Sequence, residues 1–270
     1  MDVAWYRFDL SLLFPITGSH IKRIGLARVV VGAGSMYLTV PIFISLHLGV
    51  LAWGTHGIIA PLLGLAKTPA KNYLVIDRHK IKGLPLVDKL NCVFCGYANG
   101  LCELWNVRLD QLGQLDVEVS APKKAAIGTL AALALPASLV AQFVGVGLIY
   151  DNLIAKPIGL RTRSRSEVGA LLDGRDYAAR CGRLARALLR HQKNLGIRLG
   201  SLLEQIESAF CPLKHLERRA EVVFPDHHDR FLDPDQLDEM RKILCTEGSV
   251  SEFKPTVRPW RERKAAAAKP

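Results

Sequence analysis

Two long stretches without charged residues constrain this chain more than any other feature. Residues 29–66 contain no Asp, Glu, Lys or Arg, a run of 38 residues. About 20 apolar residues are enough for a helix to cross the hydrocarbon core of a bilayer. The run therefore predicts membrane insertion. It is too long for one straight span and too short for two full ones. Two arrangements of this run stay open: one span followed by an interfacial helix, or a tight hairpin.

A second uncharged run covers residues 125–150 and is rich in Ala, Leu, Gly and Val. Its 26 residues also favour insertion into the membrane. Pro136 lies near the middle of this run, and a proline inside a helix removes one backbone hydrogen bond and kinks or breaks the helix. We expect the segment to enter the membrane as a helix or as a re-entrant hairpin broken near Pro136.

The rest of the chain divides into segments of different charge. Residues 1–28 are predicted to be an interfacial N-terminal segment. Residues 67–124 are predicted to be a polar region with the first cysteine cluster, in which residues 103–120 form a short helix followed by a strand or extended stretch. Residues 151–250 are predicted to form a basic helical domain. Residues 251–270 have no apolar face to pack and are predicted to be a disordered tail.

The basic domain contains an amphipathic pattern. Across residues 161–200, ten Lys and Arg residues face three acidic ones, and apolar residues recur at helical spacing. Gly196 and Gly200 are expected to interrupt the helix. A helix of this kind lies on anionic lipid or turns a solvated face outward from a packed core, and the sequence leaves both interpretations open.

The net charge of +11 suits either nucleic acid or an anionic membrane surface. Aromatic residues make up only 7% of the chain and are not interleaved with basic ones, which argues against nucleic acid. We therefore expect anionic membrane lipid as a partner. A protein partner within a membrane complex is a further candidate.

Two cysteine clusters have the spacing of metal ligands. Cys92 and Cys95 form a Cys-x2-Cys pair, and Cys211 and His215 form a Cys-x3-His pair about 120 residues later. If Pro212 begins a helix, Cys211 and His215 lie on one face of it, and the free N–H groups of its first turn favour a thiolate. Three sulfurs and one nitrogen make a complete tetrahedral set for one ion, zinc or iron.

The fourth ligand and the ion stay open at this point. His215 is favoured, but Cys102 in its place would give four cysteines, which suits an iron–sulfur cluster. The small and turn-forming residues at 96–100 are expected to turn backbone amides toward the sulfur of Cys95. The alternatives to a metal site are ordinary buried thiols in a reducing compartment and a disulfide between Cys92 and Cys95.

Two further polar groups contain side chains suited to catalysis or to hard metal ions. Residues 77–80 are interpreted as a solvated or headgroup-facing turn, and residues 226–229 as a polar turn. The chain contains no G-x-G-x-x-G, Walker A, G-x-S-x-G or H-E-x-x-H motif. An ordinary hydrolase or nucleotide-dependent enzyme is therefore not indicated.

The stretch IDRHKIKGLPLVDKLNCVFCGYANGL and the later FCPLKH resemble an uncharacterised family of bacterial membrane-associated proteins. That family pairs an RHK…NCxxCxYANG block with a CPxKH block. The resemblance covers roughly residues 73–101 and 205–240. It implies that the favoured metal ligands are the functional residues, and it does not require a cysteine at position 102. It carries no established activity.

A shared ion would constrain how the chain crosses the membrane. If Cys92 and Cys211 bind one ion, the segment 125–150 must cross the bilayer an even number of times, and it is too short for two full spans. Basic residues flank both apolar runs, so no flank is poor in them, as two simple crossings would require. We therefore predict a location in the bacterial inner membrane with the polar domains facing the cytoplasm. Two ordinary spans with unrelated clusters are the alternative.

Together these features predict a mainly α chain, in which membrane-inserted helices or re-entrant hairpins accompany a small helical cytoplasmic metal-binding domain. The predicted function is that of a membrane-embedded metal-binding protein, an accessory, assembly or structural subunit rather than an enzyme. The alternatives are an iron or iron–sulfur redox protein that acts on lipid or quinone, and a cationic membrane scaffold without metal.

Overall fold

The computed structural model describes residues 9–48, 58, 61, 63–65, 68–114, 120–158, 160, 164–173 and 178–246. Within them the chain is mainly helical, as the sequence predicts, with one isolated β-bridge between Leu213 and Leu232. The α-helices are α1 (Leu10–Leu13), α2 (Thr17–Ile24), α3 (Leu26–Leu38), α4 (Val40–Ser45), α6 (Leu86–Gly113), α7 (Ala121–Val140), α8 (Arg165–Asp173), α9 (Arg183–Phe210) and α10 (Leu237–Thr246). The tighter or wider helical segments are η2 (Ala70–Asn72), η3 (Arg78–Lys80), the π-helix η4 (Ala141–Ala155), η5 (Lys156–Ile158), η6 (Ala179–Cys181) and η7 (Asp226–Arg230). The predicted tail, 251–270, lies outside the described residues.

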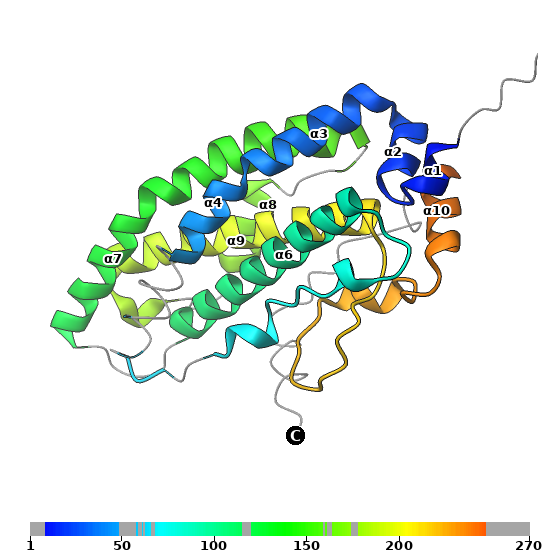
Figure 1. Cartoon of the computed structure of the whole chain (residues 1–270). Coiled ribbons are helices and arrows are strands. Elements are labelled where there is room, and N and C mark those ends of the chain that lie inside the picture. Colours follow the sequence, from blue (N-terminus) through cyan, green and yellow to red (C-terminus); the bar gives the residue numbers. More distant parts are fainter. Residues whose placement is uncertain are drawn as a thin grey trace, which may run out of the picture.

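The helices α6 and α9 form the centre of the molecule (Figure 1). They are antiparallel, because the Ala178 N–H, just before α9, donates a hydrogen bond to the carbonyl of Gly113 at the end of α6 (2.6 Å). Trp105 of α6 is 1% exposed and belongs to the main hydrophobic core. At Gly196 the helices approach so closely that a Cβ would lie 2.5 Å from Asn106 Oδ1. The antiparallel packing of this pair therefore places the start of α6 beside the end of α9.

Two predictions about these helices are wrong. α9 runs without interruption through Gly196 and Gly200, because these glycines give room to side chains of α6 instead of ending the helix. α6 already begins at Leu86 and continues to Gly113, so the first cysteine cluster lies inside a 28-residue helix rather than before a short one. Tertiary packing outweighs the local preference of glycine in both helices.

One helix among the described residues is long and apolar enough to cross a membrane. It runs over Leu26–Leu48, through α3 and α4, with a mean hydropathy of 1.9, and only 24% of it is buried within the molecule. It lies beside α7 and η4 along one edge of the molecule (Figure 1). Large apolar side chains face outward from both layers: Leu26, Val30, Val31, Leu38, Ile44 and Leu48 from the first, and Phe143, Val144, Leu148 and Leu153 from the second.

The second apolar run forms a helix across its proline. Pro136 lies inside α7, and the chain continues from Val140 directly into the π-helix η4. The prediction of a hairpin broken near Pro136 is therefore wrong, because the turns on either side of the proline keep the helix going. In the described part of this run the apolar helix, Phe143–Ala155, is shorter than a membrane span. A candidate membrane helix is thus found at residues 26–48 alone among the described residues.

A second, smaller core lies at one end of the α6–α9 pair. It joins α2 and α10 to the start of α6, and includes Ile16, Met240 and the cysteines 92 and 211. Asp88 of α6, which is fully buried, accepts hydrogen bonds from the backbone N–H groups of Ile16 and Thr17 (3.0 Å each) at the start of α2.

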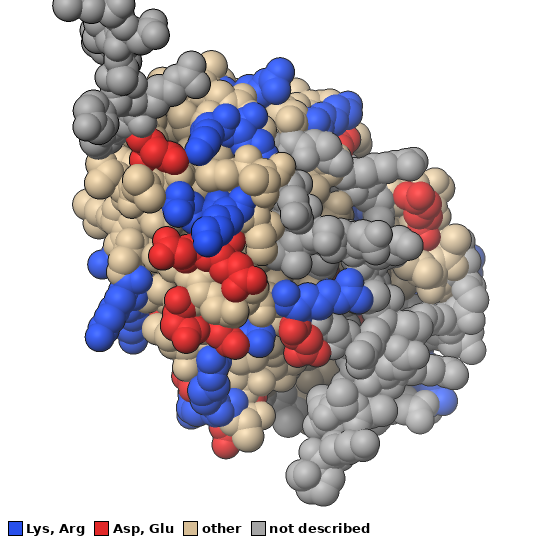
Figure 2. Space-filling model, turned by 90° about the vertical axis from the view of Figure 1, so that its right-hand side faces the viewer, with Lys and Arg blue, Asp and Glu red and all other residues tan. Residues whose placement is uncertain are grey.

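Figure 2 views the molecule from the right-hand side of Figure 1 and shows Lys and Arg mixed with Asp and Glu. The basic excess is not gathered on this face.

Candidate functional site

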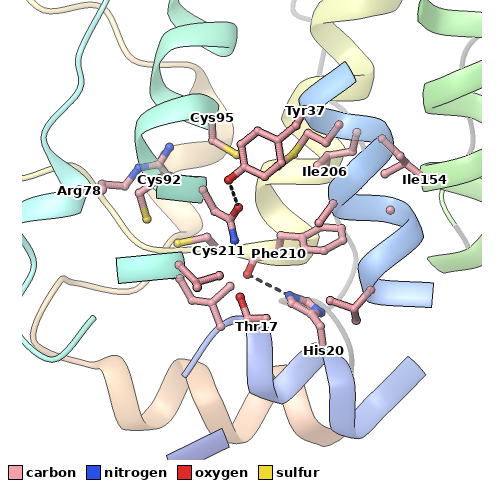
Figure 3. A pocket seen from close by; sticks show the side chains of 17 residues that line it. Thr17, His20, Tyr37, Arg78, Cys92, Cys95, Ile154, Ile206, Phe210 and Cys211 are labelled. Atoms are coloured by element: carbon pink, nitrogen blue, oxygen red, sulfur yellow. Dashed lines mark hydrogen bonds between the residues drawn. The ribbon is translucent and has the colours of Figure 1, made fainter. Parts of the chain in front are cut away.

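The structure brings the two cysteine clusters together at the end of the α6–α9 pair that carries the smaller core. Cys92 and Cys95 lie one turn apart in α6, and Cys211 directly follows the last residue of α9. Because the two helices are antiparallel, the start of α6 lies beside the end of α9. All three thiols line one cavity of about 110 Å³, which also touches α2 and α3 (Figure 3). Three of the four predicted ligands therefore share one site.

The local structure around Cys211 differs from the prediction. Pro212 does not begin a helix, because α9 ends at Phe210 and Cys211 has the non-helical backbone angles φ −152° and ψ 73°. Cys211 thus lies at the negative end of a helix dipole, which disfavours a thiolate. His215 follows in an irregular segment and is not held one helical turn above Cys211.

The thiols of Cys92, Cys95 and Cys211 are free. A hydrogen bond with Cys92, together with burial, raises the pKa of Cys211 well above its ordinary value. Burial also raises the pKa of Cys95 to about 12, although the charge of Arg78 acts in the opposite direction. Such thiols give up their protons only to a strong competitor, and a bound metal ion is one. The disulfide alternative between Cys92 and Cys95 is not formed.

Arg78 lies beside Cys92 among the residues that line the cavity (Figure 3). It is 1% exposed, forms an ion pair with Glu207 of α9, and donates a hydrogen bond to the carbonyl of Leu213 (3.2 Å). Burial alone would lower the pKa of Arg78, but the charge of Glu207 and the neighbouring thiols raises it. The interpretation of residues 77–80 as a solvated turn is therefore wrong for Arg78, which anchors this segment inside the protein.

Glu207 is the acceptor for three cationic or N–H-bearing side chains. Besides Arg78, the Nε2 atoms of His227 and His228 lie 3.2 and 3.0 Å from its Oε2. Burial would raise the pKa of Glu207, but Arg78 and both histidines outweigh it and hold the pKa well below its ordinary value. Both histidines are buried, so residues 226–229 are only in part the polar turn that the sequence suggested.

His215 lies close to His228 of η7 and beside Asp77. Its Nδ1 is 2.5 Å from Asp77 Oδ1, and its ring stacks on Phe224 and lies 5.3 Å from that of His228. Burial and the charge of Arg78 lower the pKa of His215, although Asp77 acts against them. A carboxylate on Nδ1 fixes the tautomer that leaves Nε2 for a ligand, as is usual for metal-binding histidines. The predicted role of His215 as fourth ligand stays a prediction.

The group of possible metal ligands that the described residues hold most compactly is not the predicted quartet. Glu207, His227 and His228 place their ligand atoms within 4.8 Å of one another. Arg78 joins the two groups, because it forms an ion pair with Glu207 and lines the same cavity as the three cysteines. The structure thus contains two adjacent sets of ligand-type side chains, one of sulfur and one of nitrogen and oxygen.

Cys102, the alternative fourth ligand, faces a different part of the molecule. Its sulfur lies 3.6 Å from the carbonyl of Gly196, within the contact between α6 and α9. In a helix with 1.5 Å rise per residue, Cys102 lies about 15 Å along the axis from Cys92. One iron–sulfur cluster cannot bridge that separation. The iron–sulfur alternative with Cys102 therefore does not fit α6.

Two glycines of α6 position the segment that carries Asp77 and Arg78. A Cβ at Gly96 would lie 2.7 Å from the carbonyl oxygen of Val75, and one at Gly100 would overlap the carbonyl of Tyr73. The extended segment 73–76 thus lies directly on the helix backbone. The prediction that residues 96–100 turn amides toward sulfur is wrong, because these residues are helical.

Reasoning from the sequence set Arg78 aside as part of a solvated turn and missed Glu207. Arg78 belongs to the RHK block of the resemblance, which was the signal available for it. Glu207 gave no signal, since one acid near the end of an amphipathic helix is ordinarily a solvated residue.

Comparison with protein-family models, with curated proteins and with solved structures finds no match to this chain. The site and the fold therefore define only a class: a mainly helical protein with a candidate membrane helix and a buried centre of thiols, histidines and a carboxylate.

Proposed function

We propose that this protein is a membrane-associated metal-binding protein whose ion is held by Cys92, Cys95 and Cys211, with His215 as the fourth ligand. The observation that supports this function is that three thiols, which come from positions about 120 residues apart, line one cavity beside the candidate membrane helix. Asp77 in addition holds the ring of His215 by its Nδ1, as is usual for metal-binding histidines.

The charge of Arg78 suits a thiolate site. Three thiolates and one divalent ion carry one net negative charge, and a buried negative charge needs a partner. Arg78 is buried, positively charged and lines the same cavity as the three cysteines. It therefore offers N–H donors and a compensating charge to the loaded site. When bound, the ion would tie α6 to the end of α9 and so stabilise the smaller core.

Metal analysis of the full chain, purified in detergent, tests this function. Zinc or iron is expected near one equivalent per chain or above, and Cys211→Ser is expected to lower the content by about one equivalent. Cys181→Ser is the matched control, because Cys181 is also buried but lies at the opposite end of α6, near the Leu112 carbonyl. A Cys211→Ser protein that folds and retains all of its metal would contradict the proposal.

The cellular setting is part of the same proposal. The apolar outer faces of α3, α4 and η4 support a position in a membrane, with the buried centre at its edge. The resemblance to bacterial membrane-associated proteins, the inner membrane as the location, a cytoplasmic orientation and anionic lipid as a partner stay predictions. We further propose an accessory or structural role within a membrane complex.

A second candidate function is favoured by the lining of the cavity. Beside the thiols and Arg78 it is lined by apolar residues of the candidate membrane helix, including Val29 and Met36. An apolar molecule from the bilayer, such as a quinone, would reach the thiols along this lining. Binding of a short-chain quinone that Met36→Trp abolishes, and that Met240→Leu in the smaller core does not, would support a redox role. No binding to the wild-type chain would contradict it.

A further inference from the structure

The side chains of Glu207, His227 and His228 form a second set of ligand atoms beside the cysteines. Glu207 lies in the last turn of α9, and the two histidines lie in η7, about 20 residues further along the chain. All three side chains are buried, with exposures of 1%, 3% and 8%. The smaller hydrophobic core therefore has, next to it, a compact group of two imidazoles and one carboxylate.

The distances between the ligand atoms of this group match those between neighbouring ligands of one metal ion. Two ligands that each lie about 2.1 Å from one ion are about 3.0 Å apart when they meet at a right angle. The distances from Glu207 Oε2 to the Nε2 atoms of His227 and His228 are 3.2 and 3.0 Å. A cation can thus enter among these atoms with little movement of the side chains.

The charges of the whole centre favour a second ion once the first is bound. With thiolates at Cys92, Cys95 and Cys211, the centre holds five acidic side chains, because the carboxylates of Glu207 and Asp77 lie there in ion pairs with Arg78 and His215. One divalent ion and Arg78 neutralise only three of them. A second divalent ion brings the positive charges to five, and buried centres are stable only when their charges are balanced.

We propose that Glu207, His227 and His228 bind a second divalent transition-metal ion beside the cysteine site, with Arg78 between the two ions. Two imidazoles and one carboxylate suit iron(II), zinc or cobalt(II), whereas calcium and magnesium prefer all-oxygen shells. The geometry argument stands alone, and the charge argument rests on the proposed function of the cysteines. Arg78 then pairs with the thiolate site and the carboxylate of Glu207 turns to the second ion.

Cobalt(II) titration of the metal-free full chain in detergent tests the second site, because the ligands give different spectra. Thiolate ligands give intense sulfur-to-cobalt absorption in the near ultraviolet, whereas nitrogen and oxygen ligands give only weak visible bands. The wild-type chain is expected to bind two equivalents. The double variant His227→Gln/His228→Gln is expected to bind one, with the near-ultraviolet absorption unchanged. It preserves the ion pair of Arg78 with Glu207, so it is expected to fold.

His191→Gln is the matched control, since His191 is a half-buried histidine of α9 away from the centre. Two equivalents in the double variant, or one thiolate-bound equivalent in both proteins, would overturn the second site and leave the proposed function standing. One equivalent without near-ultraviolet absorption, lost in the double variant, would support the second site and refute the cysteine site. No cobalt bound by the wild-type chain would refute both.

Discussion

Replacing Arg78 by methionine tests whether the buried ion pair organises this centre. Arg78 and Glu207 are each 1% exposed, so neither charge has solvent to stabilise it when the other is removed. Removing one partner of such a pair costs about 3–5 kcal/mol of unfolding free energy. For a chain of this size that corresponds to a decrease in melting temperature of about 10 °C. The loss includes the hydrogen bond to the carbonyl of Leu213, which holds the segment after α9.

Denaturant unfolding of the purified chain in detergent measures the effect. Lys214→Met is the matched control, because Lys214 forms an exposed ion pair with Asp233 at 3.2 Å, with 34% and 55% of the side chains exposed. That pair should contribute less than about 1 kcal/mol. Adding Glu207→Gln to Arg78→Met should cost less than the sum of the two single changes, since the second change removes the charge that the first left unpaired.

The loss in Arg78→Met should also depend on pH. Without Arg78, the largest influence that lowers the folded-state pKa of Glu207 is removed, so this pKa is higher in the variant than in the wild type. The folded variant then binds a proton more readily than the folded wild type, so its deficit is smaller at low pH and grows as pH rises. A deficit no larger than that of Lys214→Met, or one independent of pH, would refute this reasoning.

Three further outcomes are expected. Gly100→Ala should destabilise the chain by about 1–3 kcal/mol in denaturant unfolding because its Cβ would overlap a backbone carbonyl, whereas Gly128→Ala, with open space around it, should be neutral or stabilising by about 1 kcal/mol. The melting temperature should fall below pH 6.5, since burial lowers the folded-state pKa of His228 and the unfolded chain takes up the proton first; His228→Gln should flatten that slope. Leu38→Lys, in the middle of the candidate membrane helix, should reduce membrane retention on alkaline extraction, whereas Leu86→Lys, equally exposed at 71% on α6, should not.

The sequence by itself determined the helical class of the chain and the apolar character of its first long run. Helical spacing and the absence of charge are local properties, and local contacts decide them. Metal-ligand spacing in the sequence also grouped cysteines 92, 95 and 211 together.

Local patterns misled where packing between distant segments outweighed them. Glycine lowers helix stability by about 1 kcal/mol, which favours a break at Gly96, Gly196 or Gly200. In the structure these positions are where α6 meets the segment 73–76 and α9, and a Cβ would lie 2.7 Å from a backbone carbonyl oxygen at Gly96 and 2.5 Å from Asn106 Oδ1 at Gly196. The packing contacts that this close approach of the segments allows more than offset the cost of placing glycine inside a helix.

Only the tertiary structure decided the composition of the centre. Arg78 meets Glu207 across 129 positions of sequence, and Asp77 meets His215 across 138. No local pattern encodes such a pair, because each of these charged or polar residues, taken alone, is of a type that is ordinarily exposed to solvent. The antiparallel packing of α6 and α9 brings the start of one helix to the end of the other, and burial then requires that every charge there has a partner. The sequence therefore supplied the candidate ligands, and the fold decided which of them lie close together.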